Sequence, residues 1–207
     1  MPDETILCWT WPDELKGLLA SPDEKRHVTK IDCTGWLAEG LPGHVKLAAF
    51  IRQRFRERYI NPFLSLDSKV KNGFSIMAVS CLLIEAYETF RQGWPSSDRK
   101  SALAFCYFFD REDRFRDFKG YSKQFYEHVR CGILHQGETT GGWQITREVG
   151  KSLFDAPSLT VHATAFHSLL AEVTDSYSES LKTVAEKSET WKNFEKKMKA
   201  TLDNCER

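Results

Sequence analysis

The sequence predicts an all-α protein, a helical bundle with one small β-hairpin inserted near residues 142–161. Two observations support this fold class. In most long segments apolar side chains recur every three or four residues, whereas in residues 141–162 they alternate with polar ones. The first spacing places side chains on one face of a helix, and the second places them on one face of a strand. We therefore expect helices throughout, interrupted once by strands.

The helices can be placed along the chain. The segment 44–60 carries an apolar residue at every fourth position, and we expect its helix to end before Pro62, because a proline disfavours helical backbone in the residue before it. Residues 74–90 are apolar on most sides, which is typical of a central buried helix. Further helices are predicted at 98–109, 121–134, 163–182 and 186–202. The charged segment 110–118 is predicted to be a solvated loop or a helix start.

The chain is predicted to form one domain. Its 207 residues are enough for one sizeable core. Residues 1–45 contain repeated prolines and glycines, and we expect them to form an irregular elaboration that three tryptophans pack on the core, with one short helix near Pro12. Residues 46–207 would form the helical domain.

Composition limits the classes of function. The 29 basic and 29 acidic residues balance, so the protein has no overall field that would attract nucleic acid or a membrane, and any anion site must be local. No apolar run approaches the roughly 20 residues of a membrane-spanning helix, and the N-terminus lacks the pattern of a secretion signal. The six cysteines include no CxxC pair. We expect a soluble cytoplasmic protein with reduced thiols. No P-loop, GxGxxG or HExxH spacing occurs, so we expect no cofactor.

A helical segment that ends in a glycine-rich break, FYEHVRCGILHQGETTGGW, carries Arg130 and His135. The planar fork of arginine binds a phosphoryl group through two hydrogen bonds, and histidine exchanges protons near neutral pH. Together they could cleave RNA without a metal. On an unbroken helix the two side chains would point about 140° apart. We therefore expect either that Gly132 loosens the helix or that two copies of the motif face each other in a dimer.

The hexapeptide Arg130-Cys-Gly-Ile-Leu-His135 resembles the R-x4-H signature of the HEPN superfamily (higher eukaryotes and prokaryotes nucleotide-binding domains). It follows a long apolar helix that carries Glu85, which is similar to the family's layout, and the resemblance covers residues 46–184. It implies an all-α homodimer with the motif at the interface, acting as a metal-independent endoribonuclease that leaves 2′,3′-cyclic phosphate ends. Many family members act in toxin, defence or RNA-processing systems, which implies RNA and an antitoxin or regulatory protein as partners.

The resemblance also assigns roles to residues. It implies that His135 is the catalytic acid or base, that Arg130 binds the phosphate and that Glu85 orients one of them. The sequence departs from the family pattern at Cys131, where a polar residue, often asparagine, is usual. A thiol is a weak hydrogen-bond donor. This departure favours the alternative function, a non-catalytic HEPN-like module that binds RNA, a nucleotide or a protein.

Three other interpretations of the same segment remain open. Arg130 and His135 could contact the free carbonyl groups at a helix C-terminus. His128, Cys131 and His135 lie within about 60° of one another on a helix and could bind zinc, with a fourth ligand from another cysteine. Cys131 and His135 could also form a nucleophile pair.

Three further side chains are candidates for binding RNA. Arg52 and Arg56 belong to the run RQRFRERYI, in which basic residues are interleaved with aromatic ones that could stack on bases. His128 precedes the motif on the same predicted helix. The alternative for the arginines is the solvated face of an amphipathic helix. For Glu85, which needs a partner on a buried helix, the alternative is a structural ion pair with another helix.

Overall fold

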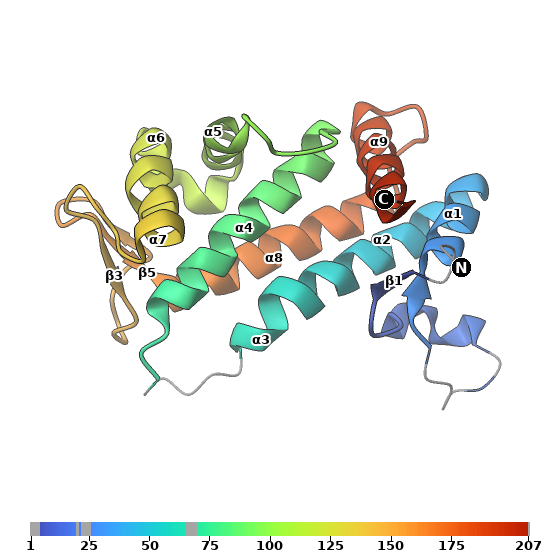
Figure 1. The fold of residues 1–207 in the computed structure, drawn as a ribbon, viewed down its shortest axis with the longest axis horizontal. Helices are drawn as coiled ribbons and strands as arrows, with labels where there is room; N and C mark the ends of the chain where they lie inside the picture. The colour runs from blue at the N-terminus through green and yellow to red at the C-terminus, as the bar shows by residue number, and fades with distance from the viewer. Residues whose placement is uncertain (1–4, 20, 22–25, 65–69, 207) are drawn as a thin grey trace. The chain divides into compact units, whose positions relative to one another are not determined.

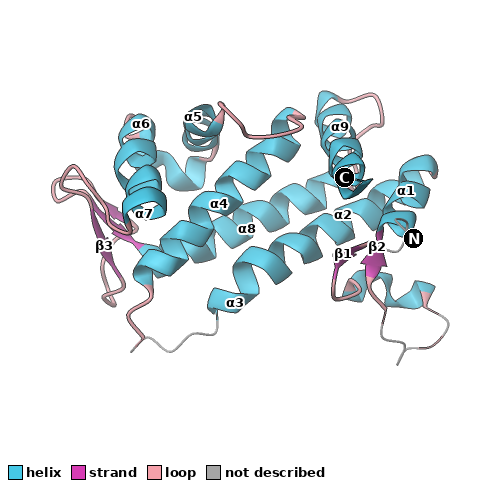
Figure 2. Cartoon of the chain, in the orientation of Figure 1, coloured by secondary structure: helices cyan, strands magenta, loops and turns pink. Residues whose placement is uncertain are grey.

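The structure, a computed structural model, describes residues 5–19, 21, 26–64 and 70–206 (Figure 1). Helix accounts for 66% and strand for 7% of the residues in the described structure, so the predicted all-α class is confirmed. Figure 2 shows the short strands in magenta beside long cyan helices.

The chain divides into two compact units, each built from separate stretches of sequence. The first unit comprises residues 1–58, 89–95 and 174–207, and the second comprises residues 59–88 and 96–173. Helices α4 (Gly73–Gln92) and α8 (Ala163–Leu181) each begin in the second unit and end in the first. The predicted N-terminal elaboration, residues 1–45, belongs entirely to the first unit.

The first unit combines helices with a short strand pair. It contains β1 (Ile6–Cys8), β2 (Val28–Thr29), a 3-10 helix (Asp13–Leu18), α1 (Lys30–Ala38), α2 (Leu41–Phe55), α9 (Glu189–Asp203) and a final 3-10 turn (Asn204–Glu206). Strands β1 and β2 are antiparallel. Helix α1 begins where Thr29 and Asp32 bond each other's backbone N–H groups, the reciprocal arrangement of a capping box. The N-terminal segment is therefore more regular than predicted, although residues 1–4, 20 and 22–25 lie outside the described residues.

The π turn Arg56–Ile60, which follows α2, holds the N-terminal segment in place. The carboxylate of Glu57 accepts hydrogen bonds of 2.9 Å from the backbone N–H groups of both Trp9 and Thr10. The guanidinium of Arg58 donates a 3.0 Å hydrogen bond to the carbonyl oxygen of Leu7. These side chains bond backbone groups of the N-terminal segment, which fixes it to the rest of the first unit.

The helix that was expected to stop before Pro62 continues past it. A π turn (Arg56–Ile60) follows α2, and the short α3 (Asn61–Leu64) includes the proline. Pro62 occupies the first turn of α3, where a backbone N–H needs no intrahelical partner, so proline is tolerated there. The prediction was wrong because a change of helix type was not considered.

The second unit holds the candidate site. Besides most of α4 and the start of α8, it contains α5 (Ser101–Arg111), a 3-10 helix (Asp113–Phe118), α6 (Ser122–Gln124), a π turn (Phe125–Arg130) and α7 (Cys131–Gln136). A cluster of phenylalanines forms its core, and each contributes roughly 1.5–3 kcal/mol through burial. The fully buried members are Phe105, Phe108, Phe109, Phe115, Phe118, Phe125 and Phe166.

Of the two alternatives for the charged segment 110–118, a solvated loop or a helix start, the structure shows a short helix, the 3-10 helix Asp113–Phe118. Phe115 and Phe118 are both 0% exposed, and their ring centroids lie 4.9 and 5.4 Å from that of Phe166. A 3-10 helix has three residues per turn, so side chains three apart lie on one side. The two phenylalanines therefore enter the core together while the charges between them face solvent.

Strands occur where the sequence predicted them, but not as a single hairpin. Strands β3 (Gln144–Thr146), β4 (Phe154–Asp155) and β5 (Thr160–His162) form one sheet in the order β3-β5-β4. The β4–β5 pair is antiparallel, whereas β3 and β5 are parallel. The Nδ1 atom of His162 accepts a 3.1 Å hydrogen bond from the backbone N–H of Ala165, so His162 caps α8.

One helix in the described part of the chain, α4, is long and apolar enough to cross a membrane by length and composition alone. In the structure 61% of its most apolar 18-residue window is buried. That burial is what a core helix of a soluble protein shows.

A buried histidine makes the stability of the second unit depend on pH. His167 on α8 is 2% exposed, its Nδ1 lies 2.9 Å from Ser80 Oγ, and its Nε2 lies 3.4 Å from the carbonyl oxygen of Ile60. Burial lowers the pKa of His167 below the usual histidine value of about 6.5. Below that value the unfolded chain binds a proton that the folded chain excludes, so stability falls with falling pH.

We expect the free energy of unfolding of the wild type to decrease between pH 7 and pH 5, and His167→Gln to show a shallower decrease. Urea titrations at several pH values measure both slopes. In His167→Gln the dependence of the unfolding free energy on pH should be reduced and not abolished, because burial also lowers the pKa of His44. Equal slopes in the two proteins would contradict this assignment.

Candidate functional site

Arg130 and Glu85 form a largely buried ion pair in the second unit. Arg130 is the last residue of the π turn before α7, and Glu85 lies on α4. The guanidinium Nε donates a 2.7 Å hydrogen bond to Oε1 of Glu85, and the side chains are 15% and 9% exposed. Burial disfavours the charged form of the guanidinium, but the bond to Glu85 raises the pKa of Arg130 above its ordinary value. The arginine is therefore charged and held in place.

Two serines complete the coordination of Glu85. Its second oxygen, Oε2, accepts hydrogen bonds from Ser101 Oγ at 2.9 Å and Ser97 Oγ at 3.3 Å. Ser101 is the first residue of α5, and Ser97 lies in the turn before it. Because both carboxylate oxygens have partners, the cost of burying this charge is offset. Of the two partners considered for Glu85 from the sequence, the structure shows Arg130.

His135 meets Arg130 within a single chain. Its Nε2 lies 3.4 Å from Nη1 of Arg130, and the imidazole is exposed on the last turn of α7. The helix between them stays α-helical. The angular argument from the sequence considered only where the side chains leave the helix. It did not allow for the length of the arginine side chain, which reaches along the surface to the next turn.

Gly132 permits a close approach of backbone and does not loosen the helix. A Cβ atom at this position would lie 2.5 Å from the carbonyl oxygen of Glu138. The chain reverses at Gly137, which has a φ of 75°, and returns along the helix so that the backbone N–H of Thr140 bonds the carbonyl of His128 at 3.0 Å. The glycine-rich segment after His135 is thus a tight turn that brings the chain back alongside the helix carrying Arg130 and His135.

His128 supports this return and does not join Arg130 and His135. Its Nδ1 lies 2.9 Å from Thr140 Oγ1, and its ring occupies the space that a Cβ on Gly141 would need. Among the described residues no group of three or more histidine, cysteine, aspartate or glutamate side chains could hold a metal ion. The zinc set considered from the sequence is therefore not assembled.

The two predicted RNA-binding arginines lie in the first unit and are paired with carboxylates. Arg52 bonds Asp175 at 3.2 Å and Glu14 at 2.8 Å, and its Nη1 also lies 3.2 Å from Glu179. Arg56 bonds the same Asp175, with Nε 3.0 Å from Oδ1. A bound phosphate would have to compete with these acidic partners. The structure thus brings Arg130, His135 and Glu85 together and places Arg52 and Arg56 in an ion-pair network.

Sequence reasoning missed Tyr126, whose ring lies beside Arg130. The guanidinium carbon is 5.6 Å from the ring centroid. Burial, and then a hydrogen bond with the thiol of Cys131, raise the pKa of Tyr126. The spacing of four residues between Tyr126 and Arg130 could have revealed this neighbour, because residues four apart face each other on a helix. Ser97 and Ser101 were also missed, since serines before a helix are ordinary capping residues.

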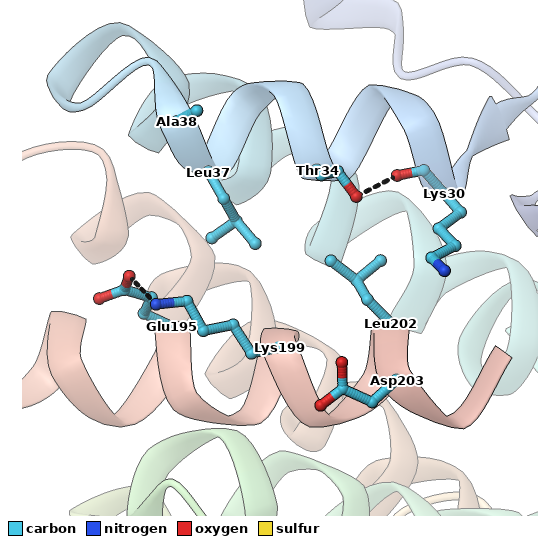
Figure 3. Close-up of a pocket in the computed structure, with 8 residues that line it drawn as sticks. All are labelled: Lys30, Thr34, Leu37, Ala38, Glu195, Lys199, Leu202 and Asp203. Carbon is cyan, nitrogen blue, oxygen red and sulfur yellow. Dashed lines mark hydrogen bonds and ion pairs between the residues drawn. The ribbon is translucent and has the colours of Figure 1, made fainter. Parts of the chain in front are cut away.

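A separate cavity of about 520 Å³ lies in the first unit, along α1 and α9 (Figure 3). Its lining residues are Lys30, Thr34, Leu37, Ala38, Glu195, Lys199, Leu202 and Asp203. Lys199 is bonded to Glu195 at 2.7 Å. Two lysines and two carboxylates balance one another, and the lining includes none of the predicted site residues.

No protein-family model matches the chain, and no curated protein or solved structure is similar to it. The chemistry of the site is therefore inferred from its own geometry and from the resemblance of its motif.

We expect the Glu85–Arg130 pair to be strongly coupled. Removing one partner leaves a buried charge unpaired and should cost about 3 kcal/mol, so Glu85→Leu and Arg130→Leu should each destabilise the protein. The double variant should lose less stability than the two single variants lose together, and the difference is a coupling energy of about 1–3 kcal/mol. Urea denaturation of the four proteins measures this.

The matched control is the exposed pair Arg114–Glu172 in the same unit, whose side chains are 49% and 63% exposed. Its coupling energy should stay below about 1 kcal/mol. Additive effects at Glu85 and Arg130 would show that the pair does not hold the site together.

Proposed function

We propose that this protein is a metal-independent endoribonuclease with a HEPN-like site, cleaving RNA to 2′,3′-cyclic phosphate ends. The observation that carries the proposal is the 3.4 Å approach of Arg130 Nη1 to His135 Nε2, with the same guanidinium anchored by Glu85. A fixed cation beside an exposed imidazole is what the cleavage of a phosphodiester without metal requires.

The hydrogen bonds of Arg130 determine which of its edges can receive a phosphate. Glu85 occupies Nε, and in the part of the chain that the structure describes no acceptor bonds Nη2. The Nη1 and Nη2 donors are therefore the ones that would bind two oxygens of a phosphate, and Nη1 lies beside His135. A phosphate bound by these two donors would lie beside the imidazole of His135.

The reaction follows from these positions. The ribose 2′-hydroxyl attacks the adjacent phosphorus and loses its proton to a base, while the bond from phosphorus to the 5′-oxygen breaks and that oxygen gains a proton. His135 would carry one of these proton transfers, and Arg130 would stabilise the extra negative charge on the phosphorane. The products are a 2′,3′-cyclic phosphate and a 5′-hydroxyl.

The need for two proton transfers supports the homodimer that the motif implies. One imidazole carries out one transfer at a time, and a second copy facing the first would supply another. Apolar side chains on α4 and α5 that are 40–42% exposed offer a surface for such a copy: Phe74, Leu82, Leu103 and Tyr107. Leu82 lies one turn before Glu85. An antitoxin or regulatory protein and a cytoplasmic location belong to the same proposal.

A second candidate function is a non-catalytic module that binds RNA, a nucleotide or a protein partner. The surroundings of His135 favour it, because in the described structure the imidazole is hydrogen-bonded to Arg130 alone. A catalytic histidine is usually oriented by a second partner. Cys131, where the family pattern has a polar residue, has its Sγ 3.9 Å from Arg130 Nη1. An anion site without turnover needs only the arginine.

We expect the purified protein to cleave end-labelled mixed RNA in excess EDTA. Arg130→Ala and His135→Ala should each lose at least about 100-fold in rate, because each removes one of the two catalytic groups. Gln136→Ala, an exposed neighbour on α7, is the matched control and should cleave like the wild type. Analysis of the new ends for cyclic phosphate identifies the reaction.

The same proteins separate the two candidate functions. RNA binding without cleavage, weakened by Arg130→Ala, would replace the nuclease by the binding module. A wild type that neither cleaves nor binds RNA would contradict both.

A further inference from the structure

The ring of Tyr126 lies against two parts of the second unit. The guanidinium carbon of Arg130 is 5.6 Å from its centroid, and the ring of Phe105 on α5 is 5.7 Å away. An arginine within about 6 Å of an aromatic face is attracted by the ring's quadrupole. Tyr126 is half-buried, so one part of it packs on the core while another supports the arginine.

Tyr126 and Arg130 belong to one π turn, Phe125–Arg130. The backbone N–H of Cys131 bonds the carbonyl of Tyr126, five residues earlier. Residues four apart are already neighbours on an α-helix, so Tyr126 would face Arg130 in either helix type, whereas residues five apart would point about 140° away from each other. The wider turn brings Cys131, five residues on, toward Tyr126 as well. Single π turns inside helices occur frequently at functional sites.

Glu85 and Tyr126 restrain the guanidinium in different ways. The bond from Nε to Glu85 fixes one edge but still permits rotation of the plane about that bond. Contact with the tyrosine ring restricts this rotation. With both restraints the Nη1 and Nη2 donors keep one direction, toward His135. A preorganised donor needs no rearrangement when charge develops in the transition state.

We propose that Tyr126 is the positioning residue for Arg130. The proposal rests on the proposed function only for its effect on RNA cleavage. The orientation of the arginine is a separate property that can be measured without RNA.

The first test measures that orientation. In two-dimensional NMR spectra, Arg130→Lys identifies the side-chain Nε–Hε signal of Arg130. Tyr126→Phe keeps the ring and should leave this signal in place. Tyr126→Met, or Tyr126→Leu if the first variant does not fold, removes the ring and should shift or broaden it. An unchanged signal in the ring-less variant overturns the proposal, whether or not the protein cleaves RNA.

The second test measures the consequence for cleavage. Tyr126→Met should lower kcat about tenfold, as expected for a lost cation–π contact in a partly buried site. It should change KM less, because Arg130 stabilises the charge that develops in the transition state. Tyr126→Phe should restore kcat to within about threefold. Tyr59→Met, at a half-buried tyrosine in the π turn Arg56–Ile60, is the matched control and should cleave like the wild type.

The outcomes separate this inference from the proposed function. A wild type that does not cleave RNA removes the function, and the NMR signal then decides the role of Tyr126 alone. A wild type that cleaves RNA, together with a ring-less variant that cleaves equally fast, keeps the function and overturns the inference.

Discussion

The carboxylate of Glu85 is the group on which the site depends. One oxygen holds Arg130 and the other holds the serines at the start of α5, so a single side chain on α4 connects three elements of the second unit. A buried carboxylate is stable only with such partners. The same bonds that offset its burial leave Nη1 and Nη2 of Arg130 without a carboxylate partner among the described residues, and Nη1 lies beside His135. The bonds to Glu85 thus stabilise the second unit and also orient Arg130 toward His135.

A second carboxylate on α4 shows the same principle without an exposed site. Glu88, one turn after Glu85, is 0% exposed and forms an ion pair with Arg111, which also bonds Glu112 at 3.2 Å. The hydroxyl of Tyr87 donates to Glu112 at 2.9 Å. These charges satisfy one another. At Glu85 the pairing ends at a guanidinium whose outer edge faces an exposed imidazole, and this difference makes one pair a candidate site and the other a structural one.

Particular residues show how much the sequence could predict. Apolar spacing located the long helices, because the period of side chains on a helix is a local property. It left residues 110–118 open between a loop and a helix start, because the charges there conceal Phe115 and Phe118. It misjudged the helix at Pro62, where the helix type changes. The strand segment was located, but its parallel pair was not, since strand order depends on where the chain returns.

The sequence by itself determined the all-α class and the chemistry of the motif, because residue type fixes what a guanidinium and an imidazole can do. Only the tertiary structure decided that Arg130 and His135 meet within one chain, that Glu85 and Tyr126 hold the arginine, and that Gly132 admits the returning chain. It also decided that Arg52 is occupied by acidic partners. Contacts between residues distant in sequence arise from packing, and a local pattern does not contain them.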